Sequence, residues 1–421
     1  MFRPSARRFA CRRRLFVAAS LVLSAIALSA CSTTIPSRSS PSQVGAPTRT
    51  TPPPGTAVAP PAPVAPSPAT PPPPSASATG KVRVALLLPL SGQNGALGNA
   101  MLDAAQMALY DIGDARLELL PRDTQGTAAG AADAARAALG EGVRLIIGPL
   151  LAAEVEAVKP VAHDANVPDL AFSTATQLAG DGTYLMGFLP QQEIERVANY
   201  AHAKGVNRFA VLAPRTPYGE IAITALRAAV QANNATLDHI DYYDPAAQDL
   251  TPVVRRFATV AADSEALLLP EGGARLRALA PLLPYYDVDP DKVHFLGTGL
   301  WDEPGLGTEP ALDNGWYAAP PPAARADFER RFLQLYRHAP PRLATLAYDA
   351  TALAAVLARG DHGADFSANA LTNPSGFAGV DGIFRFRPDG LVQRGLAVLQ
   401  VRRGGNVVID PAPDTFQAQG L

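Results

Sequence analysis

The chain is poor in cysteine and lacks acidic residues at its start. Its only two cysteines are Cys11 and Cys31, so residues 32–421 hold no disulfide, no cysteine-ligated zinc and no cysteine nucleophile. Residues 1–80 contain eight arginines and no Asp or Glu. Removing those eight from the 36 basic residues leaves about 28 against 38 acidic residues, so residues 81–421 carry about −10. This charge excludes a broadly basic nucleic-acid-binding protein.

Catalytic signatures are also missing. The sequence has no G-x-S-x-G, no HExxH and no Walker A loop. Its six histidines are scattered at 163, 202, 239, 294, 338 and 362, and none pairs with another at metal-ligand spacing. We therefore predict a protein that is not an enzyme and that uses no cofactor and no metal.

Residues 1–31 have the parts of a secretory signal. Six arginines precede a mostly apolar segment at 15–28, which is shorter than the roughly 20 residues of a membrane-spanning helix. Leu28-Ser29-Ala30-Cys31 resembles a bacterial lipobox, in which the cysteine receives lipid and becomes the new N-terminus. We predict a signal peptide at 1–30 and lipidation of Cys31, which would anchor the chain to a membrane surface. The alternative is an ordinary signal peptide with an incidental cysteine.

The segment that follows cannot build a core. Residues 31–80 are rich in Pro, Ala, Ser and Thr, and fifteen prolines lie between Pro36 and Pro74. This composition predicts a disordered, partly polyproline-II tether, on the order of 150 Å long when extended at ~3.1 Å per residue. The tether either spaces the body from the lipid or lets it reach a partner beyond the cell wall. Ser32 after the cysteine favours the outer membrane over the inner, with the body in the periplasm.

From Lys81 onward, short apolar runs alternate with stretches of helical spacing. This alternation predicts parallel sheets covered by helices on both faces. Because a single sheet would be very large, we predict an α/β fold with two doubly wound parallel-sheet lobes. The expected strands are 82–88, 116–120, 145–147, 169–172, 209–212, 236–243, 266–269 and 293–296. The expected helices are 97–111, 128–139, 152–166, 191–204, 218–232, 250–262 and 274–283.

The tail departs from the alternation. Residues 323–338 and 342–359 predict two consecutive helices, and 382–387 and 396–402 predict a strand pair around the Asp389-Gly390 turn. We expect lobe 1 to comprise 81–188 and 320–375, and lobe 2 to comprise 189–319 and 376–421. Because the chain would then cross several times between its lobes, we predict a multi-crossing hinge beside a cleft.

The candidate ligand residues lie in loops at the carboxyl ends of the expected strands, where open α/β sheets bind ligands. They are Ser91, Gly92, Gly148, Pro149, Ser173, Thr174, Thr176, Tyr218, Thr298, Trp301 and Asp302. The loop from Ser91 to Gly98 presents backbone N–H groups to an anion or is a plain strand–helix turn. The hydroxyls from Ser173 to Thr176 hold a carboxylate or cap a helix. Trp301 lines a cleft or fills a core, and we favour the cleft.

The order and content of these loops resemble the type I periplasmic binding proteins, in particular the leucine-binding-protein-like group. The resemblance rests on Leu88-Pro89-Leu90-Ser91-Gly92, Gly148-Pro149-Leu150, Phe172-Ser173-Thr174-Ala175-Thr176 and Tyr218-Gly219-Glu220. It covers nearly all of residues 81–421 and implies a small polar ligand in the cleft between the lobes.

Within that group the chain is similar to the penicillin-binding-protein activators, which are envelope lipoproteins that stimulate peptidoglycan synthases. The similarity rests on segments 145–150, 167–173, 210–219 and 296–301. It implies a regulatory lipoprotein whose partner is a penicillin-binding protein. The alternative is the substrate-binding component of an ABC importer for an amino acid or a related small molecule, with an ABC permease as partner.

Two departures from the amino-acid-binding relatives favour the regulatory reading. Those relatives place hydroxyl residues for the ligand carboxylate after the third strand, where this chain has Leu151, Ala152 and Ala153. They also place an acidic residue for the ligand ammonium where this chain has Gly299, with Asp302 the nearest carboxylate. A buried ammonium without a partner is costly, so a free α-amino acid is disfavoured as the ligand.

Overall fold

A computed structural model describes residues 80–113, 116–360 and 363–416. The expected signal peptide and lipidation site, and the tether up to residue 79, lie outside the described residues. Within the described part of the chain, no helix is long and apolar enough to cross a membrane.

Lobe 1 is built on a five-stranded parallel sheet with the order β2-β1-β3-β4-β5. Its strands are β1 (Val82–Leu88), β2 (Leu117–Asp123), β3 (Leu145–Ile147), β4 (Asp169–Ala171) and β5 (Thr183–Leu185). The order reverses between β1 and β3, so the carboxyl ends of these two strands form the switch point of the sheet.

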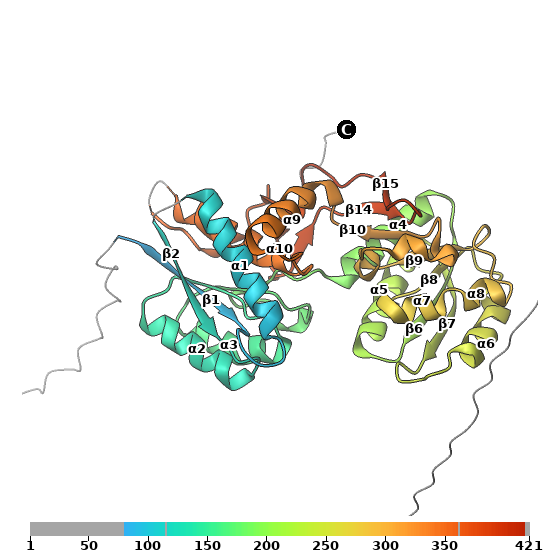
Figure 1. Ribbon diagram of the computed structural model, residues 1–421, viewed down its shortest axis with the longest axis horizontal. Coiled ribbons are helices and arrows are strands. Elements are labelled where there is room, and N and C mark those ends of the chain that lie inside the picture. The colour runs from blue at the N-terminus through green and yellow to red at the C-terminus, as the bar shows by residue number, and fades with distance from the viewer. Residues whose placement is uncertain (1–79, 114–115, 361–362, 417–421) are drawn as a thin grey trace, which may run out of the picture. The chain divides into compact units, whose positions relative to one another are not determined.

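Helices cover both faces of the lobe 1 sheet. They are α1 (Gly95–Ile112), α2 (Ala128–Gly140), α3 (Ala152–Asp164) and α10 (Ala344–Ala358), and a 3-10 turn η1 spans Thr176–Leu178. Val84 and Leu86 pack toward α1 and α10, and Ala85 and Leu87 pack toward α2 and α3. Figure 1 shows α2 and α3 together on the face away from α1. This placement explains the continuous apolar run of β1, because a strand covered on both faces has no solvent side.

Lobe 2 repeats the same winding and then extends it. Its seven-stranded sheet has the order β15-β14-β10-β9-β8-β6-β7, and β14 and β15 are antiparallel to their neighbours. The strands are β6 (Arg208–Pro214), β7 (Thr236–Tyr243), β8 (Ala266–Leu268), β9 (His294–Gly297), β10 (Trp316–Ala319), β14 (Ala397–Gln400) and β15 (Val407–Asp410). The order reverses between β6 and β8, which places the second switch point there.

The lobe 2 helices divide between the two sheet faces. α4 (Pro190–Ala203) and α5 (Pro217–Ala232) cover one face, and α6 (Thr251–Ala261), α7 (Gly273–Leu279) and α8 (Leu282–Tyr285) cover the other. Three 3-10 turns follow β9, namely η2 (Gly299–Trp301), η3 (Leu306–Thr308) and η4 (Pro310–Leu312). The two opposite cores confirm the predicted α/β fold of doubly wound lobes.

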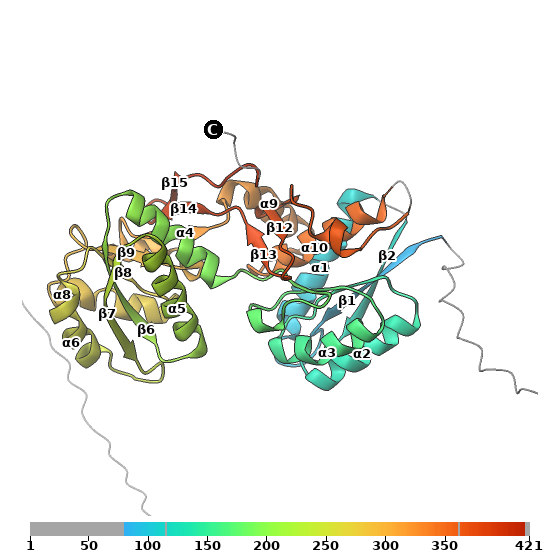
Figure 2. The ribbon, with the colours of Figure 1, turned by 180° about the vertical axis from the view of Figure 1, so that it is seen from behind.

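The C-terminal part of the chain corrects one lobe boundary. β11 (Phe377–Gly379), β12 (Gly382–Phe386) and β13 (Val392–Arg394) form an antiparallel sheet, and Phe384, Phe386 and Val392 pack in the lobe 1 core. Residues 377–394 therefore belong to lobe 1 and not, as expected, to lobe 2. Figure 2 shows β12 and β13 beside α10. α9 (Pro322–Tyr336) also packs on α1, and a short α11 spans Ala368–Leu371.

The predicted hairpin is right in its turn and wrong in its second strand. The Asp389-Gly390 turn joins β12 to β13, so the strand that follows the turn is 392–394. The more apolar segment expected at 396–402 instead forms β14, which pairs with β10 in lobe 2. The chain thus passes between the lobes at 186–189, at 320–321 and at 395–396, which gives the hinge three crossings.

Candidate functional site

In the loop after β1, backbone N–H groups form hydrogen bonds within the protein. The N–H groups of Leu90 and Ser91 donate to Oδ1 of Asp123, at 2.9 and 3.3 Å, and Gln125 donates to the same atom at 2.7 Å. Burial would raise the pKa of Asp123, but hydrogen bonds from Ser91, Gln125 and Leu90 outweigh it and lower the pKa. One N–H group of the loop expected to hold an anion, that of Ser91, is therefore already bound. Ser91 and Gly92 themselves remain exposed at the switch point.

The residues after β3 and β4 lie at the same edge of the sheet. Gly148 and Pro149 are buried, and a Cβ atom on Gly148 would lie 2.1 Å from the carbonyl oxygen of Leu87. Gly148 therefore lets β3 approach β1 closely. Ser173 accepts from the N–H of Ala175 at 3.1 Å, which makes it a local cap.

The hydroxyls of Thr174 and Thr176 differ from that of Ser173. Thr174 is exposed and Thr176 is partly exposed, and neither side chain hydrogen-bonds within the described residues. These two hydroxyls are thus free to meet a ligand at the carboxyl edge of the lobe 1 sheet.

In lobe 2 the structure joins two predicted residues that are 80 positions apart. Tyr218, at the start of α5, donates its hydroxyl to Oγ1 of Thr298, after β9, at 2.8 Å. Burial raises the pKa of Tyr218, and the nearby carboxylates of Glu193 and Glu271 raise it further. The phenol stays protonated. Together with Thr298 it forms part of a polar cluster at the carboxyl edge of the lobe 2 sheet.

Glu193 belongs to this cluster, although it was not among the predicted site residues. It lies in the first turn of α4, is only 5% exposed, and accepts from the N–H of Gly299 at 2.8 Å. A Cβ atom on Gly299 would lie 2.4 Å from Oε1 of Glu193. The carboxylate therefore occupies the space beside Gly299, where the amino-acid-binding relatives are expected to carry their own acid. Its one sequence signal, a glutamate in a first helical turn, is common to exposed helices.

The pKa of Glu193 predicts a pH dependence of folding stability. Burial raises this pKa from 4.5 to about 7, and Asp302 adds to the shift, while Gly299, Arg342 and Arg394 oppose it. The folded chain then holds a proton that the unfolded chain releases, so the contribution of Glu193 is complete below about pH 4.5 and is lost as the pH rises through about 7. We expect Glu193→Gln to remove this loss. The stability of wild type relative to the variant should fall between about pH 5 and about pH 8 in urea unfolding. Parallel pH profiles would contradict the assignment.

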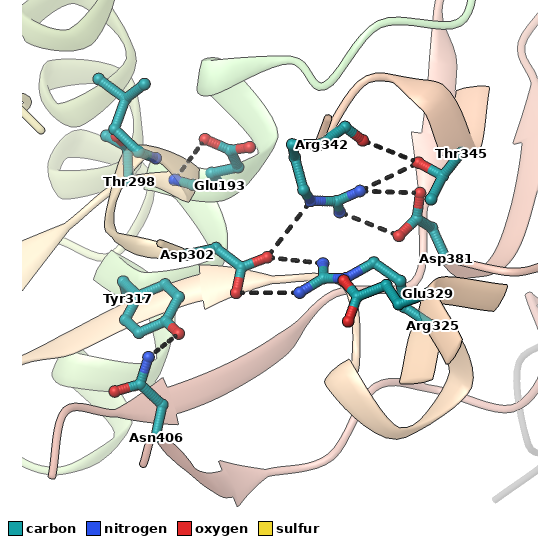
Figure 3. Close-up of polar contacts among 12 residues, drawn as sticks. Glu193, Thr298, Asp302, Tyr317, Arg325, Glu329, Arg342, Thr345, Asp381 and Asn406 are labelled. Atoms are coloured by element: carbon teal, nitrogen blue, oxygen red, sulfur yellow. Dashed lines mark hydrogen bonds and ion pairs between the residues drawn. The ribbon is translucent and has the colours of Figure 1, made fainter. Parts of the chain in front are cut away.

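Asp302 is bound by two arginines. Its carboxylate forms ion pairs with Arg325, in the first turn of α9, at 2.7 Å, and with Arg342, just before α10, at 3.3 Å. Arg342 also forms an ion pair with Asp381 at 2.9 Å (Figure 3). We call Asp302, Arg325, Arg342 and Asp381 the hinge latch, because they connect a lobe 2 loop to lobe 1 segments. The carboxylate of Asp302, a predicted ligand residue, is thus engaged by arginines within the protein.

A second set of contacts joins two of the crossings. Arg394, at the end of β13, donates to the carbonyl oxygen of Met186 at 2.6 Å, and its guanidinium lies 4.9 Å from the ring centre of Phe188. Arg196 of α4 donates to the carbonyl oxygen of Leu396 at 3.0 Å. The first and third crossings are therefore held together by charged side chains and not only by the chain.

Trp301 lies in the core and not in a cleft. Its side chain is fully buried, and it packs in the lobe 2 core with Tyr317, whose ring centre is 6.4 Å away. A Cβ atom on Gly297 would lie 2.0 Å from the indole, so the glycine of β9 makes room for the ring. The preference for the cleft was wrong because a tryptophan in a glycine-rich loop can turn back under its own strand.

The site residues are polar groups at the carboxyl ends of the strands. In the described residues, no group of three or more His, Cys, Asp or Glu side chains could hold a metal ion. Polar groups gather at the carboxyl edges of the two sheets, Thr174 and Thr176 in lobe 1 and Tyr218 and Thr298 in lobe 2, and the three crossings connect the lobes. Two doubly wound lobes with polar groups at these edges and three crossings define a two-lobe binding protein.

Comparison with known families agrees with this class. Residues 81–406 match the family model described as periplasmic binding protein. Since the match covers well over half of the sequence, the chain belongs to the periplasmic binding protein family.

Solved structures show the same fold. An ABC transporter substrate-binding protein from Sphaerobacter thermophilus has a TM-score of 0.66 and 20% identity, over 79% of this chain and 98% of its own. The leucine binding protein LivK from Thermotoga maritima has a TM-score of 0.59 and 19% identity, over 79% of this chain and 99% of its own. At these identities the likeness shows the fold alone.

Two curated proteins match part of the sequence. The penicillin-binding protein activator LpoA of Photobacterium profundum is 33% identical over 141 residues, which are 32% of this chain and 22% of LpoA. The uncharacterized protein RP748 of Rickettsia prowazekii is 20% identical over 181 residues, which are 42% of this chain and 47% of that protein. The chain therefore spans less than half of the length of either relative.

Proposed function

We propose that this protein is a non-enzymatic envelope lipoprotein that binds and regulates a peptidoglycan synthase of the penicillin-binding-protein class. The observation that carries the proposal is the pairing of Asp302 with Arg325 and Arg342, because it leaves this largely buried carboxylate no free place for a ligand ammonium. Leu151, Ala152 and Ala153 offer no hydroxyl to a ligand carboxylate. A free α-amino acid would thus bury charges without partners, which is costly.

The partial match to LpoA and the N-terminal sequence support the same proposal. LpoA is named as an activator of a penicillin-binding protein, and its matched segment is 33% identical to this chain. A lipid on Cys31 would hold the chain at the membrane, more stably with two or more acyl chains than with one. The tether would then let the body extend from the outer membrane toward a synthase across the cell wall.

The second candidate is the substrate-binding component of an ABC importer. The polar cluster of Tyr218, Thr298 and Glu193 favours it, together with the free hydroxyls of Thr174 and Thr176. The ligand of such a component would be an amino acid or a related small molecule. Of the similar solved structures, the one from Sphaerobacter is named an ABC transporter substrate-binding protein and the one from Thermotoga a leucine binding protein.

In-cell crosslinking of the lipidated chain would separate the two candidates. A photoreactive amino acid is placed at exposed positions of the body, and captured proteins are identified by mass spectrometry. We expect a penicillin-binding protein to be captured by the wild-type chain, and less of it by a Cys31→Ser variant that lacks the anchor. Capture of an importer permease in place of a synthase would contradict the proposal.

A ligand screen on the purified chain gives an independent check. A ligand present at one hundred times its Kd stabilises the folded state by about 2.7 kcal/mol, which a melting curve detects readily. We expect no stabilisation by any of the twenty amino acids. A clear rise in Tm with one of them, lost in a Tyr218→Phe/Thr298→Val variant, would favour the importer.

A further inference from the structure

A pocket of about 530 Å³ lies beside the hinge latch. Its walls come from both lobes: residues 302–308 and 402–406 belong to lobe 2, whereas Pro322, Arg325 and Arg342 belong to the lobe 1 side of the hinge. Asp302 is the only predicted ligand residue that lines this pocket. Its volume is within the usual range for small-molecule sites.

The charges in this pocket do not balance one another. Arg325 is bound by Asp302 and Glu329, each at 2.7 Å, and Arg342 by Asp302 and Asp381. Glu303, which also lines the pocket, is paired with Arg277 at 2.7 Å. All the carboxylates are therefore engaged by these three arginines.

Two further arginines of the pocket have no such partner. Arg402 donates only to the amide oxygen of Gln400, at 2.8 Å, and neither Arg402 nor Arg403 forms an ion pair with any described residue. Both are exposed at the rim, in the turn between β14 and β15. Two of the arginines that line the pocket thus have no carboxylate partner among the described residues.

The turn that carries them is held in position at both ends. A Cβ atom on Gly307 would lie 2.0 Å from the carbonyl oxygen of Arg402, so the turn packs directly on the 302–308 loop. Asn406 donates to the hydroxyl of Tyr317 at 2.7 Å (Figure 3). The positions of the arginine backbones are therefore fixed before anything binds, which lowers the entropic cost of binding.

We propose that this pocket binds a small polyanion bearing carboxylate or phosphate groups, with Arg402 and Arg403 as its donors. Guanidinium groups bind both kinds of anion through paired, charge-assisted hydrogen bonds. α9 begins at Pro322 on the pocket wall without a side-chain cap, and the positive end of its dipole adds to the attraction.

The location of the pocket gives binding a consequence for the hinge. A bound anion would contact walls from both lobes and would compete with Asp302 for Arg325. Such a ligand binds one lobe arrangement better than another and shifts the population toward it. The proposal goes beyond the proposed function, since a polyanion could tune either a synthase regulator or an importer component.

Calorimetric titration of the full chain, purified in detergent, tests the proposal with citrate and with pyrophosphate. We expect at least one of the two to bind with one site per chain. The anion that binds more tightly then identifies carboxylate or phosphate as the ligand chemistry. Absence of heat from both anions at millimolar concentration would overturn the proposal.

Matched charge variants decide whether the pocket is responsible. Arg402→Gln/Arg403→Gln should weaken binding at least tenfold, while Arg227→Gln/Arg255→Gln, which removes two exposed arginines elsewhere in lobe 2, should change it less than twofold. The altered residues are all exposed, so the variants are expected to keep the wild-type Tm. Equal weakening in both variants would show diffuse charge attraction and would overturn the site. Since the readout is anion binding, it is independent of whether crosslinking captures a synthase.

Discussion

Asp302→Asn is expected to lower the free energy of unfolding by about 3 kcal/mol. The carboxylate is 10% exposed and faces Arg325, which is 11% exposed, so the variant leaves a nearly buried guanidinium without its main counter-charge. Arg342 loses a partner in the same step. Removing one member of a buried ion pair commonly costs about 3–5 kcal/mol, because the remaining charge stays desolvated.

Chemical denaturation in urea measures this effect, and a surface pair provides the control. Asp241 pairs with Arg256 at 2.8 Å, but Arg256 is 63% exposed, so Asp241→Asn should cost about 1 kcal/mol or less. The double variant Asp302→Asn/Arg325→Met should recover part of the lost stability, because it no longer strands the Arg325 charge. An Asp302→Asn variant as stable as the Asp241→Asn control would show that the latch adds nothing to folding.

The strand and helix pattern of the body was predictable because each lobe is covered on both faces. Continuous apolar runs such as Val84–Leu88 are typical of strands that have no solvent side, and the helices between them carry one apolar stripe each. Strands as short as three residues, such as β3 and β8, were predicted because each follows a clear helix. β5 and β10 were missed because each follows 3-10 turns, so no alternation of helix and strand marks them.

The tail was harder to assign because local signals do not specify which lobe a segment joins. The Asp389-Gly390 turn was readable, but the partner strand 392–394 has only one fully apolar residue, Val392. Segment 396–402 is more apolar, so it was predicted to be the second strand of the hairpin. Its apolar character instead reflects burial between β10 and β15 in the other lobe.

The site was predictable only where a single loop carries it. Thr174 and Tyr218 follow strands directly, so the general rule for open α/β sheets locates them. The hinge latch joins residues 302, 325, 342 and 381, whose proximity depends on the path of three crossings. Glu193 was missed for the same reason, because its partner Gly299 lies more than a hundred residues away.

Trp301→Ala is expected to be the second severe variant, with a loss of about 3–5 kcal/mol in unfolding free energy. The indole is fully buried against Tyr317 and the backbone of Gly297, and alanine would leave a cavity that the rigid ends of β9 and β10 cannot fill. Urea unfolding of Trp301→Ala and of the milder Trp301→Phe should show a graded loss.

Fluorescence distinguishes this core role from the cleft role that the sequence had favoured. The chain has two tryptophans, so Trp316→Phe leaves Trp301 as the only indole emitter. We expect blue-shifted emission from this variant that acrylamide quenches poorly and that no added ligand changes, because the ring has no contact with solvent. Easy quenching, or a Trp301→Ala variant that keeps its stability but loses a ligand, would return Trp301 to the cleft.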